Sequence, residues 1–127
     1  MQSKFLFLMS IILIGFTSAC NTQVKDNNIT DITRSQGTAI LKQENITVLD
    51  VRTPGEFQQG HVKGALSLNV HQPGFDKKIG ALDRKGTYMV YCQSGRRSSQ
   101  AVRLMSQMGF TKIYHLSSGA NGGLPVR

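Results

Sequence analysis

The stretch that decides the fold reads Tyr88-Met89-Val90-Tyr91-Cys92-Gln93-Ser94-Gly95-Arg96-Arg97-Ser98. Its first four residues favour a β-strand, and they lead directly into a cysteine. A short polar loop with one glycine follows the cysteine before the next apolar pattern begins. The stretch therefore predicts a strand that ends at a thiol.

The residues after this loop predict an α-helix. Four apolar side chains recur at the spacing of a single helix face: Ala101, Leu104, Met105 and Met108. Gly109 stands where a left-handed C-terminal cap is favoured, and Ser98 and Ser99 are suitable residues for the N-terminus. We therefore expect the loop after the cysteine to end at the start of a helix.

A helix start favours an anion beside it, because its first N–H groups have no partners within the helix and the helix dipole adds partial positive charge. Cys92 would lie at this start, with Arg96 and Arg97 close by. Such surroundings lower a thiol pKa from about 8.5 toward roughly 3.5–7.5. A lone cysteine after an apolar strand is more often a small buried side chain, but the polar loop favours a reactive one. We predict a nucleophilic thiolate.

A second motif lies upstream of the cysteine. Residues 46–49 favour a strand that brings Asp50 and Arg52 to its C-terminal end, where open α/β sheets usually place their sites. Thr53-Pro54-Gly55-Glu56 predicts a capping box for a short helix that Gly60 ends. Carboxylates and an arginine in this arrangement more often form a supporting ion-pair network than a catalytic group. Of Asp50, Arg52 and Glu56, we expect Asp50 to contact the Cys92 loop.

The rest of the chain alternates strand-sized and helix-sized segments. The patterns predict strands at 29–32, 65–70 and 111–116, and helices at 33–43 and at about 75–82. Such alternation favours right-handed crossovers and a mainly parallel sheet. We expect one α/β domain over residues 29–127.

The two motifs together resemble the rhodanese family of sulfurtransferases. The family's active-site loop is similar to Cys92-Gln93-Ser94-Gly95-Arg96-Arg97-Ser98, and its upstream signature is similar to Leu49-Asp50-Val51-Arg52, Glu56, Gly60-His61 and Gly64-Ala65. The resemblance covers roughly residues 29–116. It implies a rhodanese-like fold, with a small, mainly parallel five-stranded sheet and helices on both faces.

The resemblance also implies a reaction. Cys92 would take the outer sulfur of thiosulfate or a similar donor, hold it as a persulfide and pass it to a thiophilic acceptor such as cyanide or a thiol, without a metal or organic cofactor. The backbone N–H groups of Gln93, Ser94, Gly95, Arg96, Arg97 and Ser98 would bind the persulfide. The two arginines would orient an anionic donor. His61 is expected to form a local hydrogen bond and not to act as a base.

Two other functions fit parts of the pattern. Cysteine phosphatases and arsenate reductases use similar loops, but the loop between Cys92 and Arg97 is one residue shorter than in the phosphatases, which favours a single sulfur over a tetrahedral phosphate. A sulfur-binding or sensor module without turnover is the other alternative. It is favoured by residues 117–127, which are glycine-rich and lack the family's usual tryptophan and closing helix. We expect a more open pocket edge there.

Residues 1–19 resemble a signal peptide. Lys4 gives a positive start, and residues 5–16 are uncharged but too few to span a bilayer. Thr17-Ser18-Ala19-Cys20 is similar to a bacterial lipoprotein cleavage site, although Thr17 stands where leucine is usual. We expect export to the periplasm or cell envelope with a lipid anchor at Cys20, followed by a flexible tether at 20–28. A secretory signal cut after Ala19 and an uncleaved anchor are the alternatives.

Composition limits the partners further. With Cys20 lipidated, Cys92 would have no partner for an internal disulfide, and no Cys and His cluster has the spacing of a metal site. The formal net charge of +8 is compatible with nucleic acid, an acidic membrane or anionic substrates. Export and the lack of a dense basic run argue against nucleic acid. A small anionic sulfur donor is the expected partner.

Overall fold

The computed structural model describes residues 26–121 and 124 of the 127-residue chain. The predicted signal segment, the lipidation site Cys20 and most of the predicted tether lie outside these residues. Within the described part, no helix combines the length and the apolar character needed to cross a bilayer.

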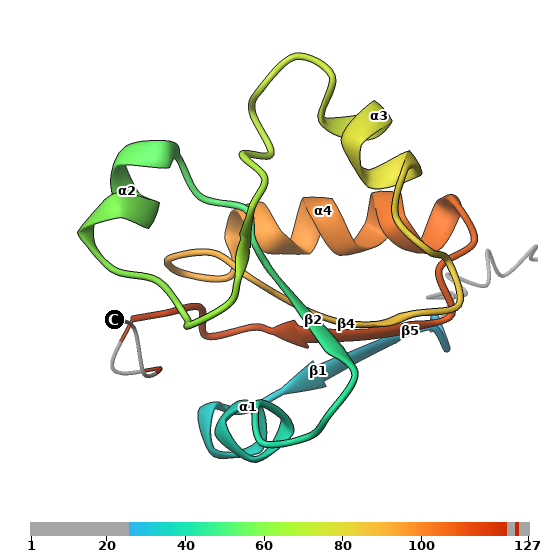
Figure 1. Ribbon diagram of the computed structural model, residues 1–127. Helices are drawn as coiled ribbons and strands as arrows, with labels where there is room; N and C mark the ends of the chain where they lie inside the picture. The colour runs from blue at the N-terminus through green and yellow to red at the C-terminus, as the bar shows by residue number, and fades with distance from the viewer. Residues whose placement is uncertain (1–25, 122–123, 125–127) are drawn as a thin grey trace, which may run out of the picture.

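Five parallel strands form a single sheet in the order β1-β5-β4-β2-β3 (Figure 1). The strands are β1 (Ile29–Ile32), β2 (Ile46–Asp50), β3 (Leu66–Ser67), β4 (Thr87–Tyr91) and β5 (Lys112–Leu116). The third position in this order belongs to β4, so Cys92 follows the central strand. The predicted α/β class and five-stranded parallel sheet are confirmed.

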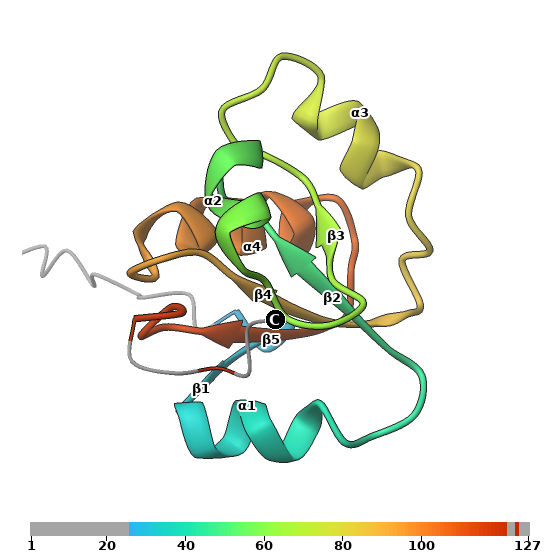
Figure 2. The ribbon, with the colours of Figure 1, turned by 60° about the vertical axis from the view of Figure 1, so that its left-hand side comes forward.

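Four helices cover the sheet: α1 (Arg34–Ile40), α2 (Pro54–Gln59), α3 (Phe75–Gly80) and α4 (Arg96–Gln107). Figures 1 and 2 show α1 on one face and both α3 and α4 on the other. Side chains of a strand alternate between the two faces. In β4, Tyr88 and Val90 pack in the cluster that contains α3 and α4, whereas Met89 and Tyr91 pack on the α1 side. The same alternation directs Cys92 toward α4.

Local signals placed several helix ends correctly. Thr53 and Glu56 form the expected capping box at the start of α2, and Pro54 is its first residue. At the end of α4, Gly109 has a φ of 94°, and the N–H of Phe110 donates to the carbonyl of Met105 at 3.1 Å. These contacts are those of a Schellman cap.

Three predicted boundaries were wrong. The strand expected over 65–70 is only Leu66–Ser67, because it pairs with β2 at just two positions, and Leu66 is 45% exposed. The helix expected over 33–43 ends at Ile40. The helix after the cysteine begins at Arg96, before the serines that were expected to start it.

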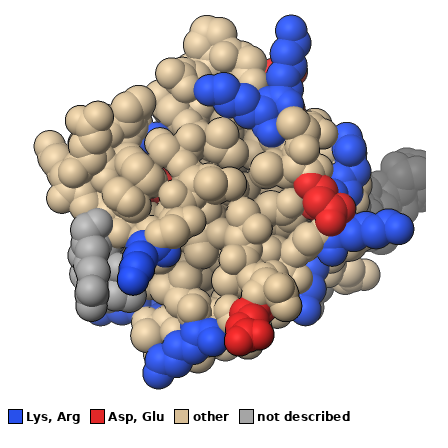
Figure 3. Space-filling model, in the orientation of Figure 1, with Lys and Arg blue, Asp and Glu red and all other residues tan. Residues whose placement is uncertain are grey.

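The basic side chains are spread over the surface in the view of Figure 3. Lys and Arg atoms occur there in several groups, with Asp and Glu atoms between some of them. This face of the molecule therefore has no single continuous basic patch.

Candidate active site

The loop after β4 is shaped by Gly95, the N-cap residue of α4. Gly95 has a φ of 92° and offers no side chain to cap the helix. A Cβ atom at this position would lie 1.8 Å from the carbonyl oxygen of Ser117. Only glycine fits this conformation and this close approach. The loop can therefore turn tightly and leave the first N–H groups of α4 available.

The sulfur of Cys92 occupies this helix start. The backbone N–H of Gly95 donates to Sγ at 3.1 Å, and the hydroxyl of Ser98 approaches Sγ at 3.4 Å. Cys92 is 0% exposed, and Ser98 is buried as well. The sequence suggested that Ser98 would start the helix. Instead, Ser98 lies within the first turn of α4, and its hydroxyl contacts the sulfur.

Two opposing effects set the protonation of this thiol. Burial raises the pKa of Cys92, whereas hydrogen bonds from the hydroxyl of Ser98 and from the backbone N–H groups of Ser98, Ser94 and Gly95 lower it. The hydrogen bonds prevail, so the pKa lies below its ordinary value. This agrees with the direction predicted from the helix start.

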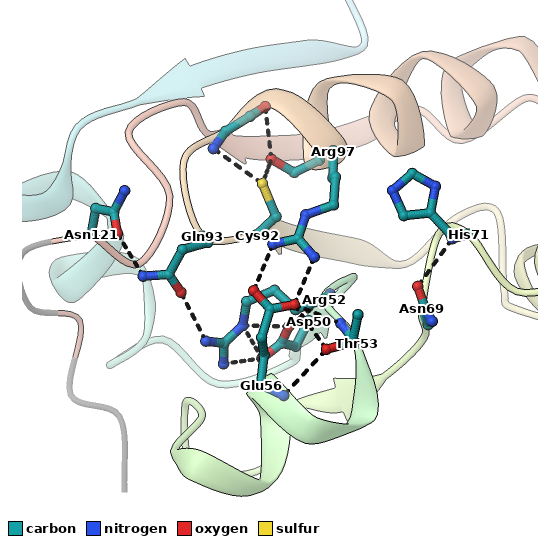
Figure 4. A network of polar contacts seen from close by, with 12 residues as sticks. Asp50, Arg52, Thr53, Glu56, Asn69, His71, Cys92, Gln93, Arg97 and Asn121 are labelled. Carbon is teal, nitrogen blue, oxygen red and sulfur yellow. Dashed lines mark hydrogen bonds and ion pairs between the residues drawn. The ribbon is translucent and has the colours of Figure 1, made fainter.

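An ion pair joins α2 to the first turn of α4. The two terminal nitrogens of Arg97 donate to the two carboxylate oxygens of Glu56, both at 2.7 Å (Figure 4). The hydrogen bond from Arg97 is the largest factor that lowers the pKa of Glu56, to about 2. Glu56 in turn raises the pKa of Arg97, and Cys92 adds to this effect. The guanidinium of Arg97 therefore interacts with the carboxylate of Glu56 and also with the thiol group of Cys92.

A second network supports the loop from β2. Arg52 donates to the carboxylate of Asp50 at 2.7 Å and to the side-chain oxygen of Gln93 at 3.1 Å. Asp50 also accepts a hydrogen bond of 2.6 Å from the hydroxyl of Tyr91. The expected structural network exists, but the residues that contact the loop are Arg52 and Glu56. Asp50 supports the loop indirectly, because its carboxylate accepts hydrogen bonds from Arg52 and Tyr91.

His61 forms the local hydrogen bond that the sequence suggested. Its Nδ1 donates to the carbonyl of Phe57 at 2.8 Å, and its ring stacks on the ring of Phe57 with 3.6 Å between centroids. Both contacts hold the imidazole against α2. The geometry supports a structural role.

The segment after β5 packs against the loop, so the expectation of an open edge is wrong for residues 117–121. The N–H groups of Ala120 and Asn121 donate to the carbonyls of Cys92 and Gln93, at 2.8 and 3.0 Å. The side chain of Gln93 also bonds to that of Asn121 (Figure 4). These bonds fix the backbone of Cys92 and of the residue that follows it.

A polar pocket of about 320 Å³ opens beside the loop. Its lining includes Arg52, Glu56, Gln59, Gly60, Gln93 and Ala120. Arg96, the first residue of α4, is exposed. Arg52 and Gln93, the two side chains that link the loop to β2, form part of the pocket wall. In the described part of the chain, no group of three or more His, Cys, Asp or Glu residues could hold a metal ion.

Two residues with contacts in this region were missed by the sequence analysis. Tyr91 bonds to Asp50 and accepts from the N–H of Val62 at 3.1 Å, and His115 of β5 bonds to Ser98. The strand alternation could have indicated that Tyr91 and Cys92 face opposite sides of the sheet. No local signal identified His115, because Ser98 lies 17 residues away in the sequence and comes close to His115 only in the folded domain.

Comparisons with known proteins agree with this geometry. Residues 33–123 match the family described as Rhodanese-like domain. Thiosulfate sulfurtransferase PspE of Escherichia coli is 37% identical over 65 residues, which cover 51% of this chain and 62% of PspE. A sulfurtransferase of Allochromatium vinosum is 32% identical over 87 residues, with 65% of this chain and 79% of the relative covered. The crystal structure of a rhodanese-related protein from Thermoplasma volcanium matches with a TM-score of 0.66 and 29% identity. This match covers 76% of this chain and 96% of the Thermoplasma chain.

Proposed function

The chain belongs to the rhodanese-like domain family, and from this membership we propose that it is a sulfurtransferase with Cys92 as its nucleophile. The observation that carries the proposal is the contact between the sulfur and the start of α4, where the N–H of Gly95 donates to Sγ and the hydroxyl of Ser98 lies 3.4 Å from it. Donors fixed around a thiol stabilise its anionic form and would stabilise a persulfide anion in the same way. The lowered pKa of Cys92 supports this assignment.

The first half-reaction would load the enzyme. The Cys92 thiolate attacks the outer sulfur of thiosulfate, a new S–S bond forms, and the original S–S bond breaks with its electron pair on the departing sulfite. The enzyme is left with a persulfide anion. Because Cys92 has no exposed surface, the donor must displace the side chains that cover it. The pocket lined by Arg52 and Gln93 is the proposed approach.

The second half-reaction would regenerate the thiolate. A thiophilic acceptor such as cyanide attacks the terminal sulfur, the persulfide bond breaks, and its electron pair returns to Cys92 as thiocyanate leaves. Dividing the transfer in this way predicts ping-pong kinetics. No proton has to be stored by a side chain in either step, which fits the structural role of His61.

The charged side chains of the loop would bind the donor. Arg97 is held in place by Glu56, and Arg96 is exposed at the first position of α4. We propose that both attract an anionic donor and that the backbone N–H groups of residues 93–98 receive the transferred sulfur. The ion pair with Glu56 orients the Arg97 guanidinium but also neutralises part of its charge.

Mass spectrometry of the purified protein after incubation with thiosulfate tests the proposal. Wild type should gain the mass of one sulfur atom, and cyanide should remove it. Cys92→Ser should gain nothing, since it lacks the nucleophile. A phosphate-sized adduct, or no adduct with any of several sulfur donors, would overturn the assignment.

The full burial of Cys92 favours a second candidate, a sulfur-binding or sensor module that holds a persulfide without efficient turnover. The two functions differ in steady-state behaviour. An enzyme should produce thiocyanate from thiosulfate and cyanide over many cycles. A module should stop after about one equivalent per Cys92, even though the mass spectrum shows the same adduct.

We further propose that residues 1–19 direct export and that a lipid on Cys20 anchors the protein in the cell envelope. Labelled palmitate supplied to expressing bacterial cells should enter the wild-type protein and not Cys20→Ser. A shortened but unlabelled protein would indicate an ordinary secretory signal instead. An unlabelled protein of full length would indicate an uncleaved anchor.

A further inference from the structure

A line of polar contacts extends from Cys92 to β1, the strand at the edge of the sheet. The hydroxyl of Ser98 lies 3.4 Å from Sγ of Cys92 and 2.9 Å from Nε2 of His115. Nδ1 of His115 lies 2.7 Å from a carboxylate oxygen of Asp31. The four residues come from the active-site loop, α4, β5 and β1. They form the sequence Cys92–Ser98–His115–Asp31.

The hydrogens in this line can be assigned from the donor and acceptor types. An ionised carboxylate only accepts, so Nδ1 of His115 must carry a hydrogen in order to bond to Asp31. When the imidazole is neutral, Nε2 therefore has a lone pair and accepts the hydrogen of Ser98. A serine hydroxyl has one hydrogen. In this state Ser98 cannot donate to Cys92.

Protonation of His115 reverses the direction of this bond. Both ring nitrogens of a cationic imidazole are donors, so Nε2 then donates to the oxygen of Ser98. The hydroxyl hydrogen becomes available to Sγ of Cys92 or to the carbonyl of Gly95, which lies 3.1 Å away. An anionic sulfur attracts the hydrogen more strongly than a neutral carbonyl does.

We propose that His115 is a positioning residue that controls whether the hydroxyl of Ser98 points at the sulfur of Cys92. The cationic imidazole turns the hydroxyl toward the thiolate, and the neutral imidazole withdraws it. The effect on the thiolate stands by itself, whereas its consequence for sulfur transfer rests on the proposed function. Asp31 is needed because it fixes which nitrogen keeps the hydrogen in the neutral form.

Other charged side chains line the same hollow as His115. This hollow of about 810 Å³ is lined by His115, by Asp31 of β1, by Asp26 before β1 and by Arg103 of α4. The two carboxylates are negatively charged, and Arg103 is positively charged. Asp31 is 71% exposed at its side chain, so protons can reach the buried ring from solvent.

The device predicts a particular pH profile for the alkylation of Cys92. A thiolate that loses a hydrogen-bond donor becomes more basic, and nucleophilicity rises with basicity. The pH profile of the rate with iodoacetamide should therefore depart from that of a single titrating thiol by about two- to fivefold, because the charge of His115 changes the hydrogen bonding of the thiolate. Ser98→Ala and His115→Phe should each restore the profile of a single titrating thiol. The double variant should behave like Ser98→Ala alone.

Nitrogen NMR of the imidazole ring supplies a readout that a merely structural role would not give. In wild type, the neutral ring of His115 should carry its hydrogen on Nδ1. Asp31→Asn should relax that preference and restore the alkylation profile of a single titrating thiol while the fold, followed by circular dichroism, is retained. His71→Phe is the control, because His71 is exposed and should leave both the profile and the His115 spectrum unchanged.

Two results would overturn the inference: a neutral His115 with its hydrogen on Nε2, or a departure from the profile of a single titrating thiol that persists in Ser98→Ala. If His115→Phe does not fold, Asp31→Asn and Ser98→Ala still decide the matter. Neither readout involves a sulfur donor. A failure of persulfide formation would therefore count against the proposed function and leave this inference to its own test.

Discussion

Helices α2 and α4 both follow neighbouring parallel strands, yet their first turns are completed in different ways. At α2, the hydroxyl of Thr53 accepts the N–H of Glu56 at 3.3 Å, and the carboxylate of Glu56 accepts the N–H of Thr53 at 3.0 Å. At α4, Gly95 supplies no side chain, and its own N–H donates to the sulfur of Cys92. One helix start is completed by its own residues and the other by the thiol.

The difference shows how a helix start becomes a site. Thr53 and Glu56 satisfy the donors of α2, so an external anion would gain little there. Replacing the capping side chain by glycine leaves donors for a ligand, and the positive φ of Gly95 turns them toward the sulfur. Glu56 belongs to both arrangements, because it completes the cap of α2 and also holds Arg97 of α4.

The largest effect should come from Gly95→Ala, which breaks the open start of α4. The new Cβ would clash with the carbonyl of Ser117 and strain a φ of 92°. We expect a loss of about 3 kcal/mol or more in the free energy of unfolding, measured with urea. Gly55→Ala is the matched control, since its Cβ meets nothing within 4 Å, and it should be neutral or slightly stabilising. Equal urea midpoints for Gly95→Ala and wild type would contradict the clash.

Glu56→Gln should weaken both helix starts. The folded pKa of Glu56 is about 2, below its ordinary value of 4.5, so the carboxylate stabilises the fold above about pH 4.5 and loses this contribution as pH falls through about 2. Because both partners are partly exposed, we expect a cost of about 1–2 kcal/mol at pH 7. The difference from wild type in thermal or urea unfolding should shrink between pH 5 and 2.

Glu44→Gln serves as the control for that experiment, because Glu44 is exposed. It should change stability by less than about 0.5 kcal/mol at any of these pH values. A cost for Glu56→Gln that stays constant with pH would show that the ion pair is not its source.

Arg97→Ala tests whether the first turn of α4 binds the donor. If the guanidinium attracts thiosulfate, KM for this donor should rise several-fold, about 1 kcal/mol of binding. Lys78→Ala removes an equal charge from the exposed side of α3 and should leave KM unchanged at the same ionic strength. An unchanged KM in Arg97→Ala would limit Arg97 to holding Glu56.

Thr53→Ala should have the smallest effect, and only the stability of the fold should change. Loss of the cap should cost about 1 kcal/mol, and Thr33→Ala, in the similar capping box of α1, should cost about the same. The alkylation rate of Cys92 should not change, since Thr53 does not contact the sulfur. A tenfold change in that rate would mean that the two helix starts are coupled through Glu56.

Local sequence signals were sufficient wherever the deciding contacts lie within a few residues. Thr53, Pro54 and Glu56 predicted the start of α2, and Gly109 predicted the end of α4, because caps are built from neighbours in the chain. The alternation at 65–70 was misleading. Strand length depends on the partner, and β3 has only Leu49 and Asp50 of β2 opposite it.

The start of α4 was misplaced for a related reason. Ser98 and Ser99 have good capping propensity, but Gly95 is fixed by the carbonyl of Ser117, which lies after the next strand. The role of Asp50 was misjudged in the same way, because Tyr91 occupies its carboxylate from the neighbouring strand. Contacts between strands override local propensity at both positions.

The sequence by itself determined the strand, loop and helix around Cys92, the parallel α/β class and the lowered pKa of the thiol, because each depends on side-chain periodicity and on donors close in the chain. Only the tertiary structure decided which side chains meet that loop. Glu56 reaches Arg97 across 41 positions, and Asp31 reaches His115 across 84. The physical reason is that hydrogen bonds act over about 3 Å, and the order of strands in the sheet sets which distant residues come within that range.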